Sequence, residues 1–377
     1  MKYKPVKMIA TLGVLLGLIT ITGTMFLILS PQFGKSATKS QKAEYSSQWN
    51  HNNGKFINHS DSPMDLDYWS LLKEMFKDAP NRNPVKNIEV EKIDSATIVN
   101  HSADITQLTW FGHSAFLLEI DGKKILIDPM FGQVPAPHPL LGPKRYSKEL
   151  PIAIEKLPFI DAVVLSHDHY DHLDYGSILK LKGKVGHYFT PLGVGNHLED
   201  WGISPEIIHT LNWWEAVDFA GLNFTCAPAR HFSGRGLFDR AETLWSSWIV
   251  TGKNHKIFFS GDSGYDTHFK EIGEKYGPFD ISLMECGQYN EDWKFLHMMP
   301  EETIRASIDL KSKLVMPIHW GGFTLALHDW MEPVERALDE AKKLNVLITT
   351  PKIGEPVILG KDTYPTGKWW KDYIKKK

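Results

Sequence analysis

Residues 161–174 read DAVVLSHDHYDHLD, a short apolar run followed by a dense cluster of imidazole and carboxylate groups. The last nine of these residues hold three histidines and three aspartates. A solvated loop could carry such residues without a function, whereas a metal site requires these ligand types at short spacing. The two interpretations differ in what the rest of the chain must supply. A metal site needs further ligands from other strands.

Four other apolar runs of the chain also end at a histidine or an aspartate. Each run has the length and composition of a buried strand. Strand ends in α/β sheets gather functional groups in one crevice, so we expect these side chains to meet. The residues at or just after the five strand ends are Asp128, His167, His169, Asp171, His172, His231, Asp262 and His319.

These ligand types suit zinc, and also manganese or iron, and none of the strand ends carries a thiolate. Without Asp128, seven groups remain. Seven are too many for one tetrahedral ion with an open position, but they suffice for two ions that share a carboxylate. Two ions about 3.5–4 Å apart can polarise a phosphoryl or carbonyl oxygen and hold a bridging hydroxide as nucleophile. The complete set therefore predicts a two-metal hydrolytic site.

The sequence around these strand ends predicts a mixed α/β domain. Residues 115–129 (AFLLEIDGKKILIDP) and 244–262 (LWSSWIVTGKNHKIFFSGD) are typical of hairpins, the first around the turn dipeptide Asp121-Gly122. Early hairpins followed by strand–helix alternation indicate two packed sheets with helices outside them. The predicted helices, of which the last two have a proline in the first turn, lie at 266–277, 299–312 and 332–344.

The N-terminal region has a different composition. Residues 8–30 (MIATLGVLLGLITITGTMFLILS) contain no charged residue and are long enough to cross the ~30 Å hydrocarbon core as a helix. A signal peptide has a shorter apolar region and a clear cleavage site, for which GKSAT (34–38) is a faint candidate. We therefore expect an uncleaved membrane anchor.

The orientation of this span is predicted from the lysines beside it. Three lysines precede it, at 2, 4 and 7, which favours a cytoplasmic N-terminus. Three more follow it, at 35, 39 and 42, and reduce the asymmetry. The expected location is the cell membrane, with a single pass and an extracytoplasmic catalytic domain.

Composition along the chain suggests five segments. The anchor at 8–30 precedes a polar, aperiodic linker at 31–62. An extension at 63–104, with a helical pattern at 64–78, is expected to pack on the main domain. The hydrolase domain comprises 105–360, and a basic tail, 361–377, follows it.

Charge and cysteine content exclude some classes of protein. The formal net charge of −3 shows no basic excess, so we expect no nucleic-acid partner. The two cysteines, Cys226 and Cys286, cannot form a disulfide framework and are expected to be buried apolar residues.

The sequence HDHYDH (167–172), with His231, Asp262 and His319, resembles the motif set of the metallo-β-lactamase superfamily. A narrower resemblance is to the N-acylphosphatidylethanolamine-hydrolysing phospholipase D branch and its bacterial relatives. It rests on stretches that occur in order along 105–360, including LTWFGHSAFLLEIDGKKILIDPMF (108–131), GPKRY (142–146), ARHFSGR (229–235), FFSGDSGY (258–265) and IHWGGFTLALHD (318–329). The resemblance implies a four-layer αβ/βα sandwich with the metals at one edge.

The resemblance also implies roles for single residues. One ion would be held by His167, His169 and His231, and the other by Asp171, His172 and His319, with Asp262 bridging. Asp128 would support the loop 166–174, which carries the first four ligands and is called the metal loop below. His113 would have a structural role or lie outside the ligands. His297 would lie near a substrate phosphate. Asp171, Asp262 and His297 are the residues that we expect to take part in catalysis.

The expected function is that of a membrane-anchored dinuclear metal hydrolase, with Zn²⁺ as the expected ion. The first hypothesis is a phosphodiesterase of phospholipase D type, acting on N-acylphosphatidylethanolamine-like lipids or small phosphodiesters by a metal-bridged hydroxide. A metal-dependent lactonase or other acyl hydrolase is an alternative, because the same ligands serve both reactions. A nuclease is disfavoured by the net charge and the anchor. A non-catalytic, membrane-tethered metal-binding module would be favoured by a missing ligand, but all seven are present.

Overall fold

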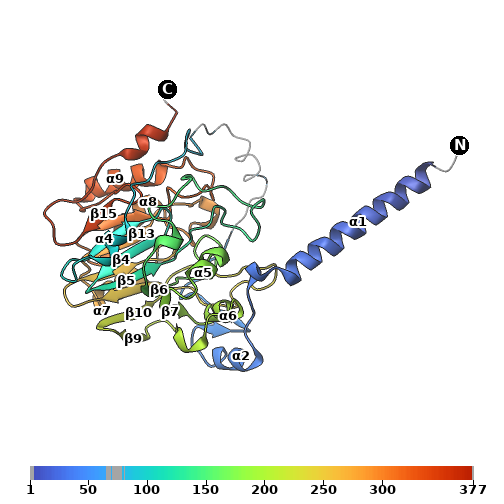
Figure 1. The fold of residues 1–377 in the computed structure, drawn as a ribbon, viewed down its shortest axis with the longest axis horizontal. Coiled ribbons are helices and arrows are strands. Elements are labelled where there is room, and N and C mark those ends of the chain that lie inside the picture. The colour runs from blue at the N-terminus through green and yellow to red at the C-terminus, as the bar shows by residue number, and fades with distance from the viewer. Residues whose placement is uncertain (1–3, 65–68, 70–78, 80, 376–377) are drawn as a thin grey trace.

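Two β-sheets form the centre of the protein, seen here in a computed structural model that describes residues 4–64, 69, 79 and 81–375 (Figure 1). The first sheet contains, in spatial order, β15 (Pro356–Ile358), β3 (Gln107–Trp110), β4 (Phe116–Ile120), β5 (Lys123–Ile127), β6 (Ile160–Val164), β7 (Val185–Pro191) and β8 (Ile208–Leu211). The second contains β14 (Val315–Ile318), β13 (Ile281–Glu285), β12 (Lys256–Phe259), β11 (Ser247–Thr251), β10 (Leu222–Ala227) and β9 (Ala216–Phe219).

Helices cover the outer face of each sheet. Beside the first sheet lie α5 (Tyr175–Leu181) and α6 (Gly195–Asp200), and beside the second lie α7 (His268–Lys275), α8 (Pro300–Asp309) and α9 (Glu332–Leu344). A short helix, α4 (Ser95–Val99), and five 3₁₀ turns occupy connections among the described residues. The four-layer αβ/βα sandwich predicted from the sequence is confirmed.

Alternating side chains of each strand supply three apolar clusters, which correspond to the three interfaces between layers. The largest lies between the sheets and includes Leu118 and Val164 from one sheet and Phe224 and Leu283 from the other. The outward-facing residues of the first sheet pack on α5 and α6, and those of the second pack on α7, α8 and α9. Because both faces of each sheet are covered, the central strands are buried along most of their length, whereas the edge strands β8, β9 and β15 are partly exposed.

The predicted hairpins and helices are confirmed. β4 and β5 pair antiparallel around Asp121 and Gly122, whose φ angles of 49° and 73° are those of a tight turn with a right-handed strand twist. β11 and β12 form the second hairpin. α8 and α9 each begin with a proline in the first turn, where the missing N–H has no helical partner to lose.

Strand direction brings the functional ends of both sheets to one edge. β5, β6 and β7 are mutually parallel, as are β12, β13 and β14. β10 is antiparallel to β11, which is antiparallel to β12, so β10 runs with β12. Backbone hydrogen bonds join the sheets at this edge, from Ser246 N to Ser166 O and from His319 N to His113 O.

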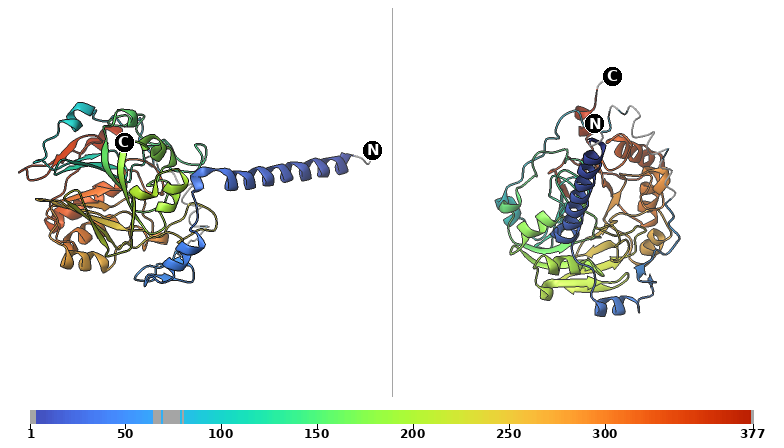
Figure 2. Two further views of the ribbon diagram at one scale, coloured as in Figure 1. Left: turned by 60° about the horizontal axis from the view of Figure 1, so that its bottom comes forward. Right: turned by 90° about the vertical axis from the view of Figure 1, so that its right-hand side faces the viewer.

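The N-terminal helix α1 (Lys4–Leu29) projects from the domain (Figures 1 and 2). Its residues Met8–Leu29 are apolar and long enough to cross a membrane, properties that a signal sequence shares. The side chains of this part are not buried by the domain. The orientation across a membrane stays a prediction.

The polar segment 31–62, expected to be a linker, lies on the domain surface. It contains a 3₁₀ turn (Pro31–Phe33), α2 (Lys39–Tyr45) and the strand pair β1 (His51–Asn52) and β2 (Lys55–Phe56). Tyr45 and Phe56 are buried in the cluster between the sheets. The few apolar residues of this segment are thus core residues, which its polar composition concealed. The helical pattern at 64–78 lies largely outside the described residues.

The C-terminal segment, expected to be a basic tail, also contributes to the core. Its 3₁₀ turn Trp369–Tyr373 buries Trp369, Trp370 and Tyr373. The rings of Trp369 and Trp370 lie 5.4 and 5.5 Å from that of Trp320, next to the strand-end residue His319. The tail therefore supports the edge of the sheet that carries the cluster of histidines.

We predict that Trp370→Ala lowers the free energy of unfolding by about 3–5 kcal/mol, the usual cost of removing a large buried aromatic side chain. Trp370 is fully buried, and its Nε1 donates to Glu335 Oε1 at 2.6 Å. Urea unfolding of the detergent-solubilised chain, followed by tryptophan fluorescence and far-UV circular dichroism, measures the loss. Trp370→Phe, which retains an aromatic ring, should lose less. A loss below about 1 kcal/mol for the alanine variant would show that the tail is not part of the cooperative core.

Candidate active site

Seven histidine and aspartate side chains converge where the strands of the two sheets end. The structure brings together all seven of the residues that the sequence predicted to be metal ligands. The loop after β6 supplies His167, His169, Asp171 and His172, and the ends of β10, β12 and β14 supply His231, Asp262 and His319. His169 and Asp171 are half-buried, and the others are buried.

The first cluster comprises His167, His169, His231 and one oxygen of Asp262. Nε2 of His167 lies 2.9 Å from Nδ1 of His169, and Nε2 of His231 lies 3.2 Å from the same atom. Oδ2 of Asp262 is 3.8 Å from Nε2 of both His167 and His231. Four candidate ligand atoms therefore surround one point, all within 4.8 Å of one another.

The second cluster comprises Asp171, His172 and His319, with His113 beside them. Oδ2 of Asp171 lies 3.5 Å from Nε2 of His172. Oδ1 of Asp262 lies 3.1 Å from Nε2 of His172 and 3.1 Å from Nδ1 of His319. The two oxygens of Asp262 thus face different clusters, which is an arrangement suited to a carboxylate shared by two cations.

The protonation chemistry of the clusters fits bound cations. Burial lowers the pKa of His167, His231 and His319 well below the usual value, and that of His169 to about 4. These imidazoles are therefore neutral near pH 7. In the first cluster, ring nitrogen atoms of His167, His169 and His231 lie close together, and neutral imidazoles offer them too few protons to form hydrogen bonds among themselves. A bound cation would satisfy the lone pairs that have no donor.

Two further observations support this fit. Burial opposes a charge on His172, but Asp262 and Asp171 outweigh it and raise the pKa of His172 well above its usual value. The carboxylates therefore stabilise positive charge at this point. Among the described residues, Nε2 of His172 and Oδ1 of Asp262 are buried and have no hydrogen-bond partner, although they lie 3.1 Å apart.

Asp128 holds the metal loop from the neighbouring strand, β5. Its Oδ1 accepts from the backbone N–H of Ser166, and its Oδ2 accepts from Nδ1 of His172 at 2.8 and 2.7 Å, respectively. The second bond fixes the tautomer of His172, so that Nε2 faces the cluster. Asp128 is itself fully buried and has a positive φ of 39°, an unusual conformation for a non-glycine residue.

His113 orients Asp171 from the end of β3. Its Nε2 lies 2.8 Å from Oδ2 of Asp171. The φ angles of His113 and His319 are 57° and 65°, and their backbones are hydrogen-bonded to each other across the two sheets. Backbone strain of this kind persists only where the surrounding structure fixes it, and it often marks a functional site.

His297 also reaches the clusters, within 4.8 Å of ligand atoms of Asp262 and His319. Its Nδ1 lies 3.0 Å from Oε1 of the buried Glu285, which leaves Nε2 for the cleft. Glu285 accepts bonds from the backbone N–H groups of Ser263 and Met298, while burial raises its pKa well above the usual value. Glu285, which ends β13, was not predicted, because the strand-end pattern considered only histidine and aspartate; the same pattern extended to glutamate would have included it.

Asn58, in the segment expected to be a linker, fixes the backbone of His231. Its Nδ2 donates to His231 O at 2.8 Å, and its Oδ1 accepts from His231 N at 3.1 Å. The same oxygen accepts from Nε1 of Trp245 at 2.9 Å. No local pattern in the sequence indicates this role, because the partners are 173 residues apart.

Arg235 is hydrogen-bonded to the backbone of the metal loop. Its guanidinium donates to the backbone oxygens of Asp168 and Leu173, and it lies 4.1 Å from the ring centre of Tyr170. The Asp168 carboxylate accepts from Gly234 N and Thr243 Oγ1 and lies 3.3 Å from Nε2 of His197. Burial alone would raise the pKa of Asp168, but the bond from His197 holds it below its usual value.

The two clusters form one wall of a cleft of about 280 Å³. His169, Asp171, Asp262, His297 and His319 line its polar side. The remaining lining is mainly apolar and consists of Met64, Phe232, Trp293, Leu296 and Leu325, with Gln288. Such a cleft suits a substrate with both a polar reacting group and an apolar part.

Known proteins resemble this chain in fold and in sequence. Residues 123–320 match the family described as "Beta-lactamase superfamily domain". An uncharacterised protein of Mycobacterium tuberculosis is 43% identical over 286 residues, which cover 74% of this chain and 75% of that protein. An N-acyl-phosphatidylethanolamine-hydrolyzing phospholipase D 1 of Caenorhabditis elegans is 35% identical over 266 residues, 67% of this chain and 72% of that protein. The solved structure of a metallo hydrolase from Ignicoccus hospitalis superposes with a TM-score of 0.52 at 24% identity, covering 68% of this chain and 100% of that one.

We predict that Asn58→Ala weakens metal binding about 10–100-fold, the usual effect of removing a residue that holds a ligand in place. The backbone of His231 would lose both bonds that fix it. Titration of the demetallated chain with Zn²⁺, followed by elemental analysis after dialysis, measures the change. Asn223→Ala, a substitution earlier on β10, is the matched control. Equal affinity in the two variants would refute the positioning role of Asn58.

Proposed function

The chain belongs to the metallo-β-lactamase superfamily and is a metal-dependent hydrolase, and on this basis we propose that it is a membrane-anchored phosphodiesterase of phospholipase D type. The observation that carries this proposal is the amphiphilic cleft. Its histidine and aspartate residues suit a phosphodiester, and its apolar lining of Met64, Phe232, Trp293 and Leu325 suits an acyl or alkyl chain. A lipid phosphodiester combines these two parts in one molecule.

The proposed cofactor is a pair of Zn²⁺ ions. His167, His169 and His231 would hold one ion, and Asp171, His172 and His319 the other, with Asp262 shared. Histidine and carboxylate ligands also accept manganese or iron, so the preference for zinc rests on the predominance of imidazole. When bound, such ions supply Lewis-acid polarisation of a phosphoryl oxygen and activation of a water molecule.

The side chains around the clusters would position the substrate and fix the ligands. Burial keeps Glu285 protonated by raising its pKa well above the usual value, so its O–H can donate to Nδ1 of His297 and leave Nε2–H to donate to a phosphoryl oxygen in the cleft. His113 and Asp128 hold Asp171 and His172 in fixed orientations. The apolar wall would exclude water from all but the reacting end of the substrate, which strengthens these electrostatic interactions.

Two findings support a lipid rather than a soluble phosphodiester. The Caenorhabditis elegans relative, which this chain matches over 72% of its length, is named for hydrolysis of N-acyl-phosphatidylethanolamine. In addition, Met8–Leu29 has the length and composition of a membrane anchor, which would keep the domain beside a lipid substrate.

We predict that the purified chain binds two equivalents of Zn²⁺ and that the number of ions each variant retains depends on the cluster from which a ligand is removed. His169→Ala should retain about one ion, because it removes a ligand of the first cluster only. Asp262→Ala should retain fewer, since both clusters lose a carboxylate oxygen. Inductively coupled plasma mass spectrometry after dialysis measures the content. A wild-type chain that binds a single ion, or no ion, would contradict the shared-carboxylate assignment.

We predict that the zinc-loaded chain cleaves N-acylphosphatidylethanolamine in mixed micelles on the head-group side of the phosphate. Mass spectrometry of products formed in ¹⁸O-water should find the label in the phosphatidate, because water attacks phosphorus. Asp171→Asn and His231→Ala should lower the turnover more than about 100-fold, beyond the loss typical of a residue outside the metal ligands. Asp200→Asn, at the end of α6, is the matched control. Turnover of lactones without turnover of phosphodiesters would instead favour an acyl hydrolase.

A further inference from the structure

Two loops of the domain carry large apolar side chains that are almost fully exposed. Phe238 is 90% exposed and Leu140 is 86% exposed, which makes them the most exposed large apolar residues of the described chain. Their neighbours Leu237 and Leu141 are 69% and 62% exposed. Apolar groups presented as a group, rather than singly, usually mark a surface that is covered in the working protein.

Both loops lie at the point where α1 leaves the domain. The ring of His138, two residues before Leu140, lies 6.0 Å from that of Phe26 near the end of α1. Arg235, two residues before Leu237, donates from Nε to the backbone oxygen of Gln32 at 2.8 Å. Figure 1 and the left view of Figure 2 show α1 from the side, and in both the two loops lie beside the place where α1 meets the domain. We call Leu140, Leu141, Leu237 and Phe238 the root surface.

The connection between α1 and the domain is too short to separate them. α1 ends at Leu29, and the backbone oxygen of Pro31 already accepts from Nε1 of Trp201 at 2.8 Å. Two residues span at most about 7 Å. The N–H of Lys35 then donates to Nδ1 of His197 at 3.0 Å, so the chain stays attached beyond this point. A bilayer that contains α1 would therefore lie against the root surface.

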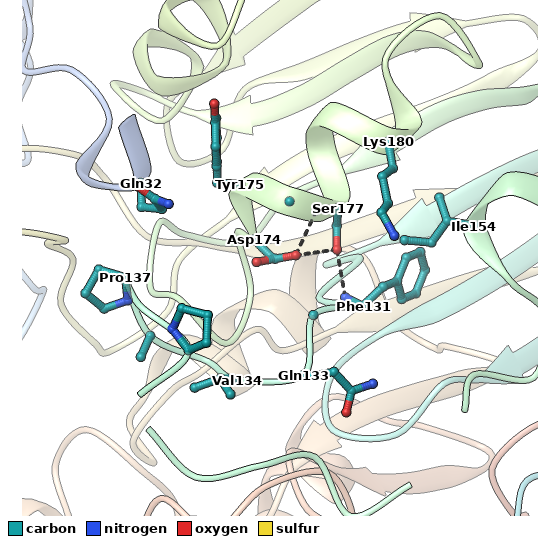
Figure 3. Close-up of a pocket in the computed structure, with 14 residues that line it drawn as sticks. Gln32, Phe131, Gln133, Val134, Pro137, Ile154, Asp174, Tyr175, Ser177 and Lys180 are labelled. Atoms are coloured by element: carbon teal, nitrogen blue, oxygen red, sulfur yellow. Dashed lines mark hydrogen bonds between the residues drawn. The ribbon is translucent and has the colours of Figure 1, made fainter. Parts of the chain in front are cut away.

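The domain is also hollowed beside the root of α1. A pocket of about 280 Å³ lies between Gln32, the loop 131–139 and the start of α5 (Figure 3). Its lining is largely apolar, with Phe131, Val134, Pro137 and Ile154 among its side chains. The hollow extends the apolar character of the root surface to the first turn of α5.

We propose that the root surface docks on the bilayer that α1 enters and holds the mouth of the active-site cleft at the lipid surface. The proposal rests on the membrane anchoring proposed above. Its occupant is the lipid bilayer, because α1, the most apolar segment of the described chain, leaves the domain between the two loops. Transfer of exposed leucine and phenylalanine side chains from water into the bilayer interface is favourable.

The loop that carries Phe238 also borders the cleft. The guanidinium of Arg240 lies 3.8 Å from the ring centre of Phe232, which lines the cleft, and its Nη2 lies 3.3 Å from Sδ of Met64 on the same wall. A docked loop would therefore place the apolar wall of the cleft next to the lipid. A substrate could then enter without passing its acyl chains through water.

Depth-dependent fluorescence quenching tests the docking directly. Leu140→Cys and Phe238→Cys would be labelled with an environment-sensitive dye in the full chain, reconstituted in vesicles of phosphatidylcholine and phosphatidylglycerol. The natural cysteines Cys226 and Cys286 are buried and should not react. Brominated phosphatidylcholine should quench both labels at least twofold.

Two control positions make the result specific. Ile19→Cys lies on α1 and reports whether the helix enters the bilayer. Leu347→Cys is 54% exposed, but its backbone oxygen is bonded to Val315 at the start of β14, the end of the strand opposite to His319. A label at 347 should not be quenched.

The outcomes separate the docking from the proposed function. Quenching at 19 without quenching at 140 and 238 would overturn the docking and leave the anchor intact. No quenching at any position would overturn both the anchor and the docking. If the labels at 140 and 238 are shielded from solvent even without lipid, the root surface is covered by a second copy of the chain, and the docking is overturned.

A kinetic experiment tests whether docking increases turnover of a lipid substrate. The double variant Leu237→Ser, Phe238→Ser should lower turnover of a phosphodiester lipid in vesicles about tenfold and leave turnover of a soluble phosphodiester unchanged. An equal loss on both substrates would show damage to the site instead of lost docking, and it would overturn the proposal. If neither substrate is turned over by the wild-type chain, the phosphodiesterase proposal fails, while the quenching result still decides the docking.

Discussion

Buried ligand groups without compensating partners are concentrated at one sheet edge, and the residues around them are arranged to hold them there. Asp262, buried among six imidazoles, has one oxygen 3.1 Å from His172 and His319 and the other 3.8 Å from His167 and His231. Without a cation, burial raises the pKa of this carboxyl group to about 7, although the charge of His172 opposes the rise. A buried polar cluster of this kind is costly unless every atom is satisfied. The surrounding residues hold the ligands in the one arrangement that a cation can satisfy.

Two rigid sheets supply that arrangement. Each ligand leaves its strand within a few residues of the last ladder hydrogen bond, and strands anchored in three apolar clusters leave the ligands little freedom to move. Backbone hydrogen bonds from His319 N to His113 O and from His113 N to Trp320 O join the sheets at the site itself, where His113 and His319 both have a positive φ. The stability of the core thus sustains local strain that the loops alone could not maintain.

The parts of the site that could be predicted from the sequence are those determined by local patterns. Apolar runs that end in histidine or aspartate indicated the strands, their direction and the seven clustered residues, and the turn at Asp121-Gly122 indicated the first hairpin. Glu285 ends β13 in the same way, but a pattern limited to histidine and aspartate does not include it. Asn58, Arg235 and Trp370 could not be found in this way, because each acts on partners more than 30 residues distant in the chain. Similarly, the polar composition of 31–62 concealed the buried Tyr45 and Phe56.

The packing of segment 31–62 changes how the anchor relates to the active site. A flexible linker would leave the domain free to rotate above the membrane, whereas here the root of α1 shares partners with the metal loop. Arg235 donates both to Gln32 O and to Asp168 O, and His197 lies between Lys35 N and the Asp168 carboxylate. Asp168 in turn separates His167 from His169 in the chain. Two hydrogen-bonded side chains therefore connect the start of the segment after α1 to the backbone that presents the first cluster. Asn58, at the other end of the same segment, fixes His231 of that cluster. The segment that joins the helix to the domain is consequently part of the structure that holds the ligands, through the backbone of Gln32 and Lys35 and the side chain of Asn58.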